Sequence, residues 1–162
     1  MTEKIRTERF CSAVFEMKGD MYAVAVSLLK NKEDAEDVVQ QTLYKAYERL
    51  DTLRFSEKFR PWIMKILTNE CYAVIRGRKQ TLPSENIEEL PDRDSGTEEK
   101  ITLWETVSRL KIEQRTVVLL FYYQDLPIKE ISKVLGISED TVKKRLSRAR
   151  DTLRHSLEEV YS

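Results

Sequence analysis

The sequence has few of the residues that interrupt helices, since only four of its 162 residues are glycine and four are proline. Strand-like alternation of apolar and polar residues is also scarce, and no internal repeat or low-complexity tract occurs. Because glycine and proline are the residues least favourable inside helices, this composition favours long ones. Hydrophobic residues make up 41% and charged residues 35%, as in a soluble globular protein. We therefore expect an all-α fold.

Long apolar runs are missing as well. None approaches the roughly 18 residues that a membrane-spanning helix requires. The N-terminal sequence MTEKIRTERF lacks the apolar core of a signal peptide. We therefore expect a cytoplasmic protein with no membrane insertion.

Cysteine and histidine are scarce too, with only Cys11, Cys71 and His155. Their spacing is not that of metal ligands, so we expect no metal site and no cofactor. A disulfide is disfavoured in the reducing cytoplasm, and both cysteines are predicted to pack as small hydrophobic residues. The chain also lacks Gly-rich phosphate loops and paired catalytic groups, which argues against an enzyme.

The net charge is zero, but the charges are unevenly distributed. Residues 1–79 and 106–162 each carry a net charge of +3, whereas residues 80–105 carry −6. A local basic face matters more for phosphate binding than the overall sum does. Nucleic-acid binding therefore stays open for both basic blocks.

The acidic segment QTLPSENIEELPDRDSGT shows no sustained apolar periodicity and contains two prolines and a glycine. Segments of this composition join domains. We therefore predict two small helical domains, residues 1–80 and 98–162, joined by a flexible acidic linker at 81–97.

Apolar residues recur at helical spacing in both domains. In the first domain, the second helix should begin near Glu33, and the third should have Pro61 in its first turn and end near Lys79. The predicted core residues there are Phe10, Val14, Met17, Met21, Ala25, Leu28, Val39, Leu43, Ala46, Tyr47, Leu50, Ile63, Ile66, Leu67 and Val74. Those of the second domain begin with Ile101, Trp104, Val107, Leu110, Val117, Leu120 and Phe121.

The segment LPIKEISKVLGISEDTVKKRLSRARDTL predicts two helices joined by a short turn, as in a helix-turn-helix. Gly136 can adopt the left-handed conformation that ends the first of them, and Ser138 is a good N-cap for the second. Glu139 and Asp140 suit the positive end of that helix.

The last helix has an apolar and a basic face. Val142, Leu146, Ala149 and Leu153 lie within a narrow arc and should pack inward. A solvated basic helix in an ordinary bundle is the alternative, but the preceding helix, the turn glycine and the cap favour DNA binding. Arginine and lysine there can bond guanine edges or neutralise phosphates. The residues predicted to bind DNA are Thr141, Lys143, Lys144, Arg145, Ser147 and Arg148.

The third helix of the first domain carries a polar, basic stripe with one aromatic residue, spanning an arc of about 80°. Such a stripe can track a phosphate backbone and stack on an unpaired base, although an ordinary solvated face fits equally well. Its members are Lys65, Asn69, Tyr72, Arg76 and Lys79.

The two halves together resemble the extracytoplasmic-function (ECF) family of RNA polymerase sigma factors over nearly the whole chain. The resemblance rests on DAEDVVQQTLYKAYERLD and FRPWIMKILTNECYAVIRGRK in the first half. In the second half it rests on LKIEQRTVVLLFYYQDLPIKEISKVLGISEDTVKKRLSRARDTL. Many regulators end in a helix-turn-helix, but its pairing with the first segments is specific to this family.

The resemblance implies a sigma factor that binds core RNA polymerase, recognises promoter −35 and −10 elements and aids promoter melting. The helix with Asp37, Gln40 and Gln41 would dock on the clamp helices of the β′ subunit, although position 41 is commonly acidic in the family. The segment Asp51–Arg60 would capture a flipped −10 base, with Asn69 nearby. The final helix would read the −35 element with Lys143, Lys144, Ser147 and Arg148.

The resemblance also implies the β subunit among the partners and allows an anti-sigma factor as a further one. A one-component helix-turn-helix regulator is the main alternative, but residues 1–79 show no βα alternation and no phosphoacceptor context. An interaction protein without promoter activity is the other alternative.

Overall fold

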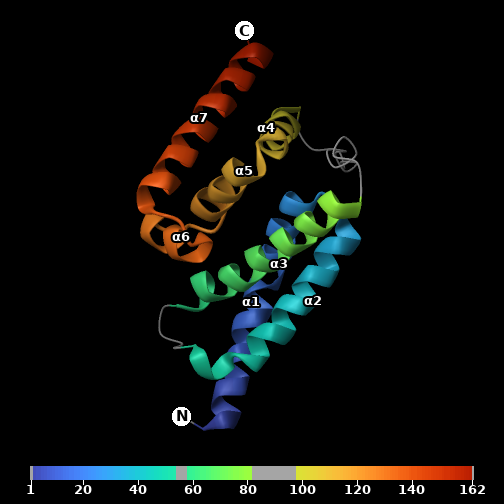
Figure 1. The fold of residues 1–162 in the computed structure, drawn as a ribbon, viewed down its shortest axis with the longest axis vertical. Helices are drawn as coiled ribbons and strands as arrows, with labels where there is room; N and C mark the ends of the chain where they lie inside the picture. Colours follow the sequence, from blue (N-terminus) through green and yellow to red (C-terminus); the bar gives the residue numbers. More distant parts are fainter. Residues whose placement is uncertain (1, 54–57, 82–97, 162) are drawn as a thin grey trace. The chain divides into compact units, whose positions relative to one another are not determined.

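All the regular structure in the described part of the chain is helical, as the composition predicted. The computed structural model describes residues 2–53, 58–81 and 98–161 (Figure 1). The predicted linker lies outside these ranges from residue 82 onward.

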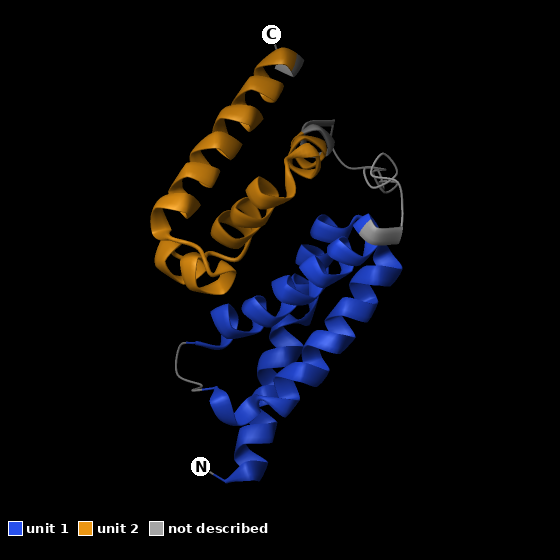
Figure 2. Cartoon of the chain, viewed as in Figure 1, with its two compact units in different colours: residues 1–88 blue, residues 89–162 orange. Residues whose placement is uncertain are grey.

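The chain forms two compact units, residues 1–88 and residues 89–162 (Figure 2). Among the described helices, none has both the length and the apolar character needed to span a membrane.

Unit 1 contains α1 (Glu3–Leu29), α2 (Lys32–Glu48) and α3 (Phe59–Thr81), with a 3₁₀ turn, η1 (Leu50–Thr52), after α2. Each of the three α-helices packs on the other two. Pro61 lies in the first turn of α3, as predicted, and α3 continues two residues beyond the predicted end at Lys79.

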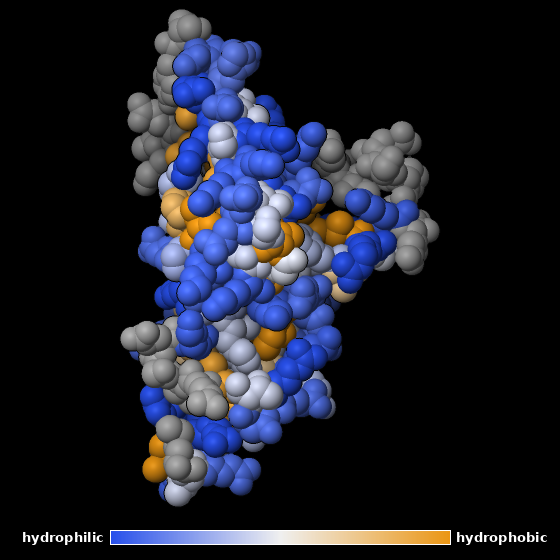
Figure 3. Space-filling model, turned by 60° about the vertical axis from the view of Figure 1, so that its left-hand side comes forward, coloured by the Kyte–Doolittle hydropathy of each residue, from blue (hydrophilic) through white to orange (hydrophobic). Residues whose placement is uncertain are grey.

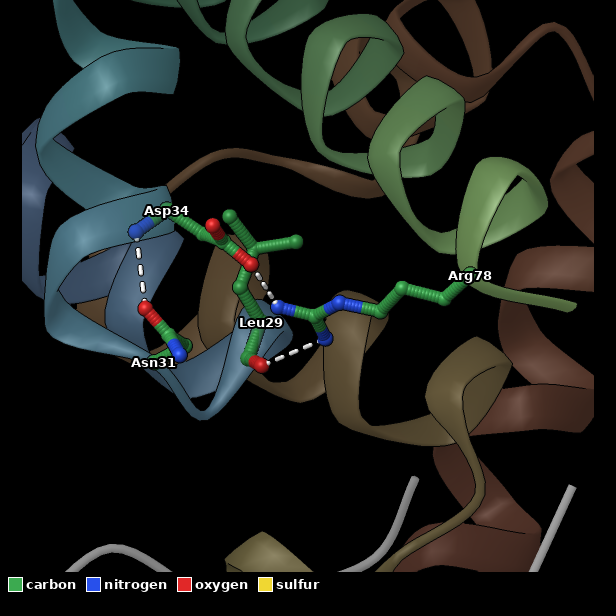
Figure 4. Close-up of polar contacts among 4 residues, drawn as sticks. All are labelled: Leu29, Asn31, Asp34 and Arg78. Carbon is green, nitrogen blue, oxygen red and sulfur yellow. Dashed lines mark hydrogen bonds and ion pairs between the residues drawn. The ribbon is translucent and has the colours of Figure 1, made fainter. Parts of the chain in front are cut away.

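A network of polar contacts holds the corner between α1 and α2 (Figure 4). Lys30 ends α1 in the left-handed conformation, with φ 55°. Asn31 then caps α2, because its side-chain oxygen accepts from the N–H of Asp34 at 2.8 Å. The Arg78 guanidinium, near the end of α3, donates to the Leu29 carbonyl at 2.7 Å and pairs with the Asp34 carboxylate. Arg78 therefore ties the end of α3 to the corner that joins the other two helices.

Most of the predicted core of unit 1 is confirmed, but Tyr47 is not part of it. Tyr47 is 56% exposed, and its ring lies at the edge of the core, 6.0 Å from the Phe10 ring. The buried face of α2 instead includes Ala35, Val38 and Thr42. Apolar spacing alone could not identify this buried face. Alanine and threonine are only weakly apolar, and a tyrosine at the margin of an apolar stripe can contact the core while most of its ring stays exposed.

The two cysteines differ, so the prediction that both pack in the core is wrong for one of them. Cys71 on α3 is fully buried, whereas Cys11 on α1 is exposed. Cys11 follows directly after the core residue Phe10, and neighbouring residues on a helix point about 100° apart. Burial raises the pKa of the Cys71 thiol to about 12, with Glu70 adding to the increase and Arg78 opposing it.

We expect these environments to separate the two thiols kinetically. The thiolate is the reactive form, and at neutral pH Cys71 holds its proton and is shielded by its neighbours. In the native protein a thiol reagent should therefore modify one cysteine rapidly, and the second only after unfolding. The Cys11→Ser variant should lose the fast reaction, and two fast thiols in the wild-type protein would contradict the burial of Cys71.

Unit 2 contains α4 (Glu98–Arg109), α5 (Ile112–Val118), the π-helical turn η3 (Leu119–Tyr123), α6 (Ile128–Leu135) and α7 (Glu139–Tyr161). Helix α7 packs against α4, α5 and α6. The predicted core residues Leu110, Val117 and Leu120 are buried, and so are Ile131, Val134, Val142, Leu146 and Ala149.

One predicted core residue of α4 is exposed. Trp104 is 40% exposed and is not a core residue, and the side chain of Ile101 lies outside the described residues. The C-terminal end of α4 is stabilised by a buried arginine of α5, Arg115, which apolar spacing could not indicate. Arg115 donates to the carbonyls of Ser108 at 3.1 Å and Leu110 at 2.8 Å. It thereby satisfies acceptors that the end of α4 leaves unpaired.

Candidate nucleic-acid interface

The turn between α6 and α7 has the geometry that the sequence predicted. Gly136 ends α6 in the left-handed conformation, with φ 66°. The N–H of Ile137 donates to the Ser132 carbonyl at 3.1 Å, and the Ser132 hydroxyl donates back to the Ile137 carbonyl. The Ser138 hydroxyl accepts from the N–H of Thr141 at 3.0 Å and caps α7. These contacts fix the angle at which α7 leaves α6, as a helix-turn-helix requires.

The predicted division of α7 into two faces is also confirmed. Val142, Leu146 and Ala149 are at most 1% exposed, and Leu153 is half-buried. On the outer side, Lys143, Lys144, Ser147 and Arg148 are exposed, whereas Thr141 and Arg145 are half-buried at its margins. The apolar face therefore holds the helix in unit 2 and leaves the basic face available to a ligand.

Sequence analysis did not single out Arg150, which also lies on α7. Its guanidinium Nε donates to the hydroxyl of Tyr122 on η3 at 2.6 Å. Because the two residues are 28 positions apart, helical spacing on α7 alone could not indicate this contact.

The polar stripe of α3 lies on the surface of unit 1. Four of its residues, Lys65, Asn69, Arg76 and Lys79, are exposed, and Tyr72 is half-buried. The same helix buries Ile63, Met64, Leu67 and Cys71 on its other side.

The segment expected to capture a −10 base can be placed only in part. The 3₁₀ turn η1 covers Leu50–Thr52, Leu53 is buried, and α3 begins at Phe59. Residues 54–57 lie outside the described residues.

The three predicted polymerase-binding residues share one exposed face of α2. Asp37 lies three and four positions before Gln40 and Gln41, and all three are exposed. Tyr44, one turn further along, is 66% exposed and extends the same face with an aromatic ring. Tyr44 was not among the residues predicted to bind polymerase. It lies four and three positions after Gln40 and Gln41, and this spacing could have placed it on the same face.

Hydrophilic residues cover most of the surface visible in Figure 3. The large apolar side chains that are exposed come from both units and include Phe15, Tyr44, Leu103 and Tyr122.

Comparison with known families matches the two units to two regions of one class of protein. Residues 15–81 match the family described as Sigma-70 region 2, and residues 100–153 match Sigma-70, region 4. The α2 and α3 faces lie within the first match, and the helix-turn-helix lies within the second. The chain therefore has the two regions of a sigma-70-type subunit of RNA polymerase.

Individual relatives define the group within that class. RNA polymerase sigma factor SigV of Bacillus subtilis is 31% identical over 148 residues, which cover 90% of this chain and 89% of SigV. ECF RNA polymerase sigma factor SigW of the same species is 29% identical, over 94% of this chain and 91% of SigW. Among solved structures, the sigma factor RpoE in complex with the anti-sigma factor NepR, from Bartonella quintana, matches with a TM-score of 0.78 at 25% identity. That match covers 92% of this chain and 96% of RpoE.

This chain belongs to the extracytoplasmic-function family of RNA polymerase sigma factors. It is a promoter-directing subunit, whose partners are core RNA polymerase and promoter DNA.

Proposed function

We propose that the two basic helix faces divide promoter recognition between them. In this proposal α7 reads the −35 element and α3 engages the −10 element, while the exposed face of α2 docks on the β′ clamp helices. The observation that carries it is the presence of one exposed basic helix face on each compact unit, within the matches to regions 2 and 4. The protein contributes specificity and not catalysis, and it works in the cytoplasm, where RNA polymerase acts.

The −35 contact is proposed to use the outer face of α7 in the major groove of duplex DNA. An α-helix fits that groove, where lysine and arginine can bond guanine O6 and N7. Lys144, Ser147 and Arg148 point away from the buried stripe of α7 and are exposed. Lys143 and Arg145 flank them, with Thr141 beside the cap. They are placed to contact either base edges or the neighbouring phosphates.

The −10 contact is proposed to use the stripe on α3 and to include unpaired DNA. Lys65, Arg76 and Lys79 can follow the phosphate backbone, while the Tyr72 ring offers a stacking surface. Asn69 can donate to and accept from the edge of an extruded base with its single amide group. The stripe can therefore hold a separated strand, which favours promoter melting.

The polymerase contact is proposed to centre on Asp37, Gln40 and Gln41, with Tyr44 as a further anchor. Interface energy concentrates in large aromatic side chains near the middle of a contact, and Tyr44 is the most exposed aromatic residue of α2. An anti-sigma factor is a further proposed partner. This proposal is supported by the structural match to RpoE, which was solved in complex with the anti-sigma factor NepR.

Selection of promoters from a random DNA library tests this function. Core polymerase reconstituted with the protein should enrich a bipartite motif, with two conserved elements at a fixed spacing. Variants of Arg148 should alter only the upstream element, and variants of Asn69 only the downstream one. A single or palindromic motif, enriched without polymerase, would instead indicate a one-component regulator.

A further inference from the structure

The side chain of Arg150 is held in one position by two aromatic residues of η3. Besides the hydrogen bond to the Tyr122 hydroxyl at 2.6 Å, its guanidinium carbon lies 5.7 Å from the Phe121 ring centroid and 5.6 Å from that of Tyr122. The two rings meet edge to face, with their centroids 4.9 Å apart. Cation–π attraction and the hydrogen bond act together, so the guanidinium is oriented before any ligand arrives.

Arg150 lies on the same edge of α7 as two of the proposed DNA-binding residues. Lys143, Ser147 and Arg150 are spaced i, i+4 and i+7, which places them within about 60° on the helix surface. All three are exposed. The Arg150 guanidinium is therefore presented beside the face that is proposed to meet DNA.

The hydrogen-bonding capacity of this pair is only partly used. A guanidinium has five N–H donors, and the contact with Tyr122 engages only Nε. Within the described part of the chain, no carboxylate pairs with Arg150. The neighbouring Asp151 pairs with Arg154 at 2.8 Å. The Tyr122 hydroxyl accepts from Arg150 and keeps its own O–H to donate, on a side chain that is 53% exposed.

We propose that Arg150 and Tyr122 form a phosphate-binding site for the promoter backbone next to the −35 reading face. The Nη groups of Arg150 and the hydroxyl of Tyr122 would donate to one phosphate, giving a planar, charged donor and a neutral one. Arginine suits this contact because its fork matches phosphate oxygens and is held in place beforehand. The site rests on the proposed −35 function of α7 and adds to it a contact that fixes register without reading sequence.

The test measures binding of reconstituted holoenzyme to a promoter duplex that the wild-type holoenzyme has selected, as a function of salt. The Arg150→Gln variant should lower the slope of log affinity against log salt by about 0.9 and weaken binding about fivefold to tenfold near 0.1 M salt. The loss should be equal for every −35 substitution. The Arg150→Lys variant keeps the charge and should keep most of the slope. The Tyr122→Phe variant keeps the ring and should weaken binding a few-fold without changing the slope.

Two comparisons make the result decisive. Arg154→Gln removes the same charge one turn further along α7, where Asp151 already pairs with it, and should change the slope less than Arg150→Gln does. An Arg150→Gln protein with a lower melting temperature but an unchanged slope would show that the contact is only structural. A loss of binding confined to one base pair would show that Arg150 reads sequence. Either result overturns the proposal.

If Lys144 and Arg148 variants also leave −35 use unchanged, the proposed function of α7 itself fails. If only the Arg150 variants are silent, the phosphate site alone is wrong.

Discussion

Leu146→Ala is expected to destabilise unit 2 by about 2–5 kcal/mol, because it removes a large side chain from a packed core. Leu146 is 1% exposed and lies in the middle of the buried stripe of α7. Thermal or denaturant unfolding of the purified variant measures this loss. The matched control is Arg148→Ala, a truncation two positions away at an exposed side chain, which should leave the melting temperature nearly unchanged.

The same pair of variants separates stability from recognition. Arg148→Ala should impair use of the −35 element while the protein stays folded. A bidentate contact with guanine would make the loss about 1–3 kcal/mol at one base pair, whereas a phosphate contact would weaken all sequences and lower the salt slope by about one. Promoter use across single −35 substitutions at two salt concentrations distinguishes the two. An Arg148→Ala protein that unfolds, or that initiates normally throughout, would refute the orientation given to α7.

Asn69→Ala is expected to cause a severe defect in promoter opening with no loss of fold. Asn69 is exposed on α3, so its truncation removes little packing. What it removes is an amide that can donate to and accept from the edge of an extruded base. Open-complex formation on a duplex promoter, followed by footprinting of unpaired bases, measures the defect.

A template whose −10 region is already unpaired should restore much of the activity of Asn69→Ala, since the difficult step has been bypassed. Lys65→Ala is the control on the same stripe. Lys65 is proposed to contact phosphate, so its loss should weaken binding on both templates, and pre-melting should not compensate for it. Normal opening by Asn69→Ala on duplex DNA would remove Asn69 from the −10 site.

Features that depend on local chain geometry were predictable from the sequence. Gly136 and Ser138 meet requirements that involve only a few neighbouring residues, namely a left-handed residue and a side-chain acceptor near a helix end. The buried stripe of α7 followed from spacing because its apolar and basic residues separate cleanly. The helix-turn-helix and its outer face could therefore be identified before the structure was known.

Features that depend on the partner of a helix could not be predicted in the same way. Trp104 and Tyr47 lie at the edges of apolar stripes, and only the neighbouring helices decide how far such edges are covered. The Arg78 contact with the corner of α1 and α2 joins residues 44 and 49 positions apart. Arg150 and Tyr122 likewise meet only through the packing of α7 on the α5–η3 segment. Periodicity along one helix carries no information about these pairings.

The free protein and the holoenzyme should differ sharply in how they bind one selected promoter. Each of the two proposed DNA-binding surfaces is small and covers only part of a promoter, so we expect polymerase to hold both in register and raise their effective concentration. We predict weak, poorly specific duplex binding by the free protein, and initiation from a defined start site when core polymerase is added. Tight, specific binding without polymerase, or no promoter-specific initiation with it, would contradict the proposed division of promoter recognition between the two units.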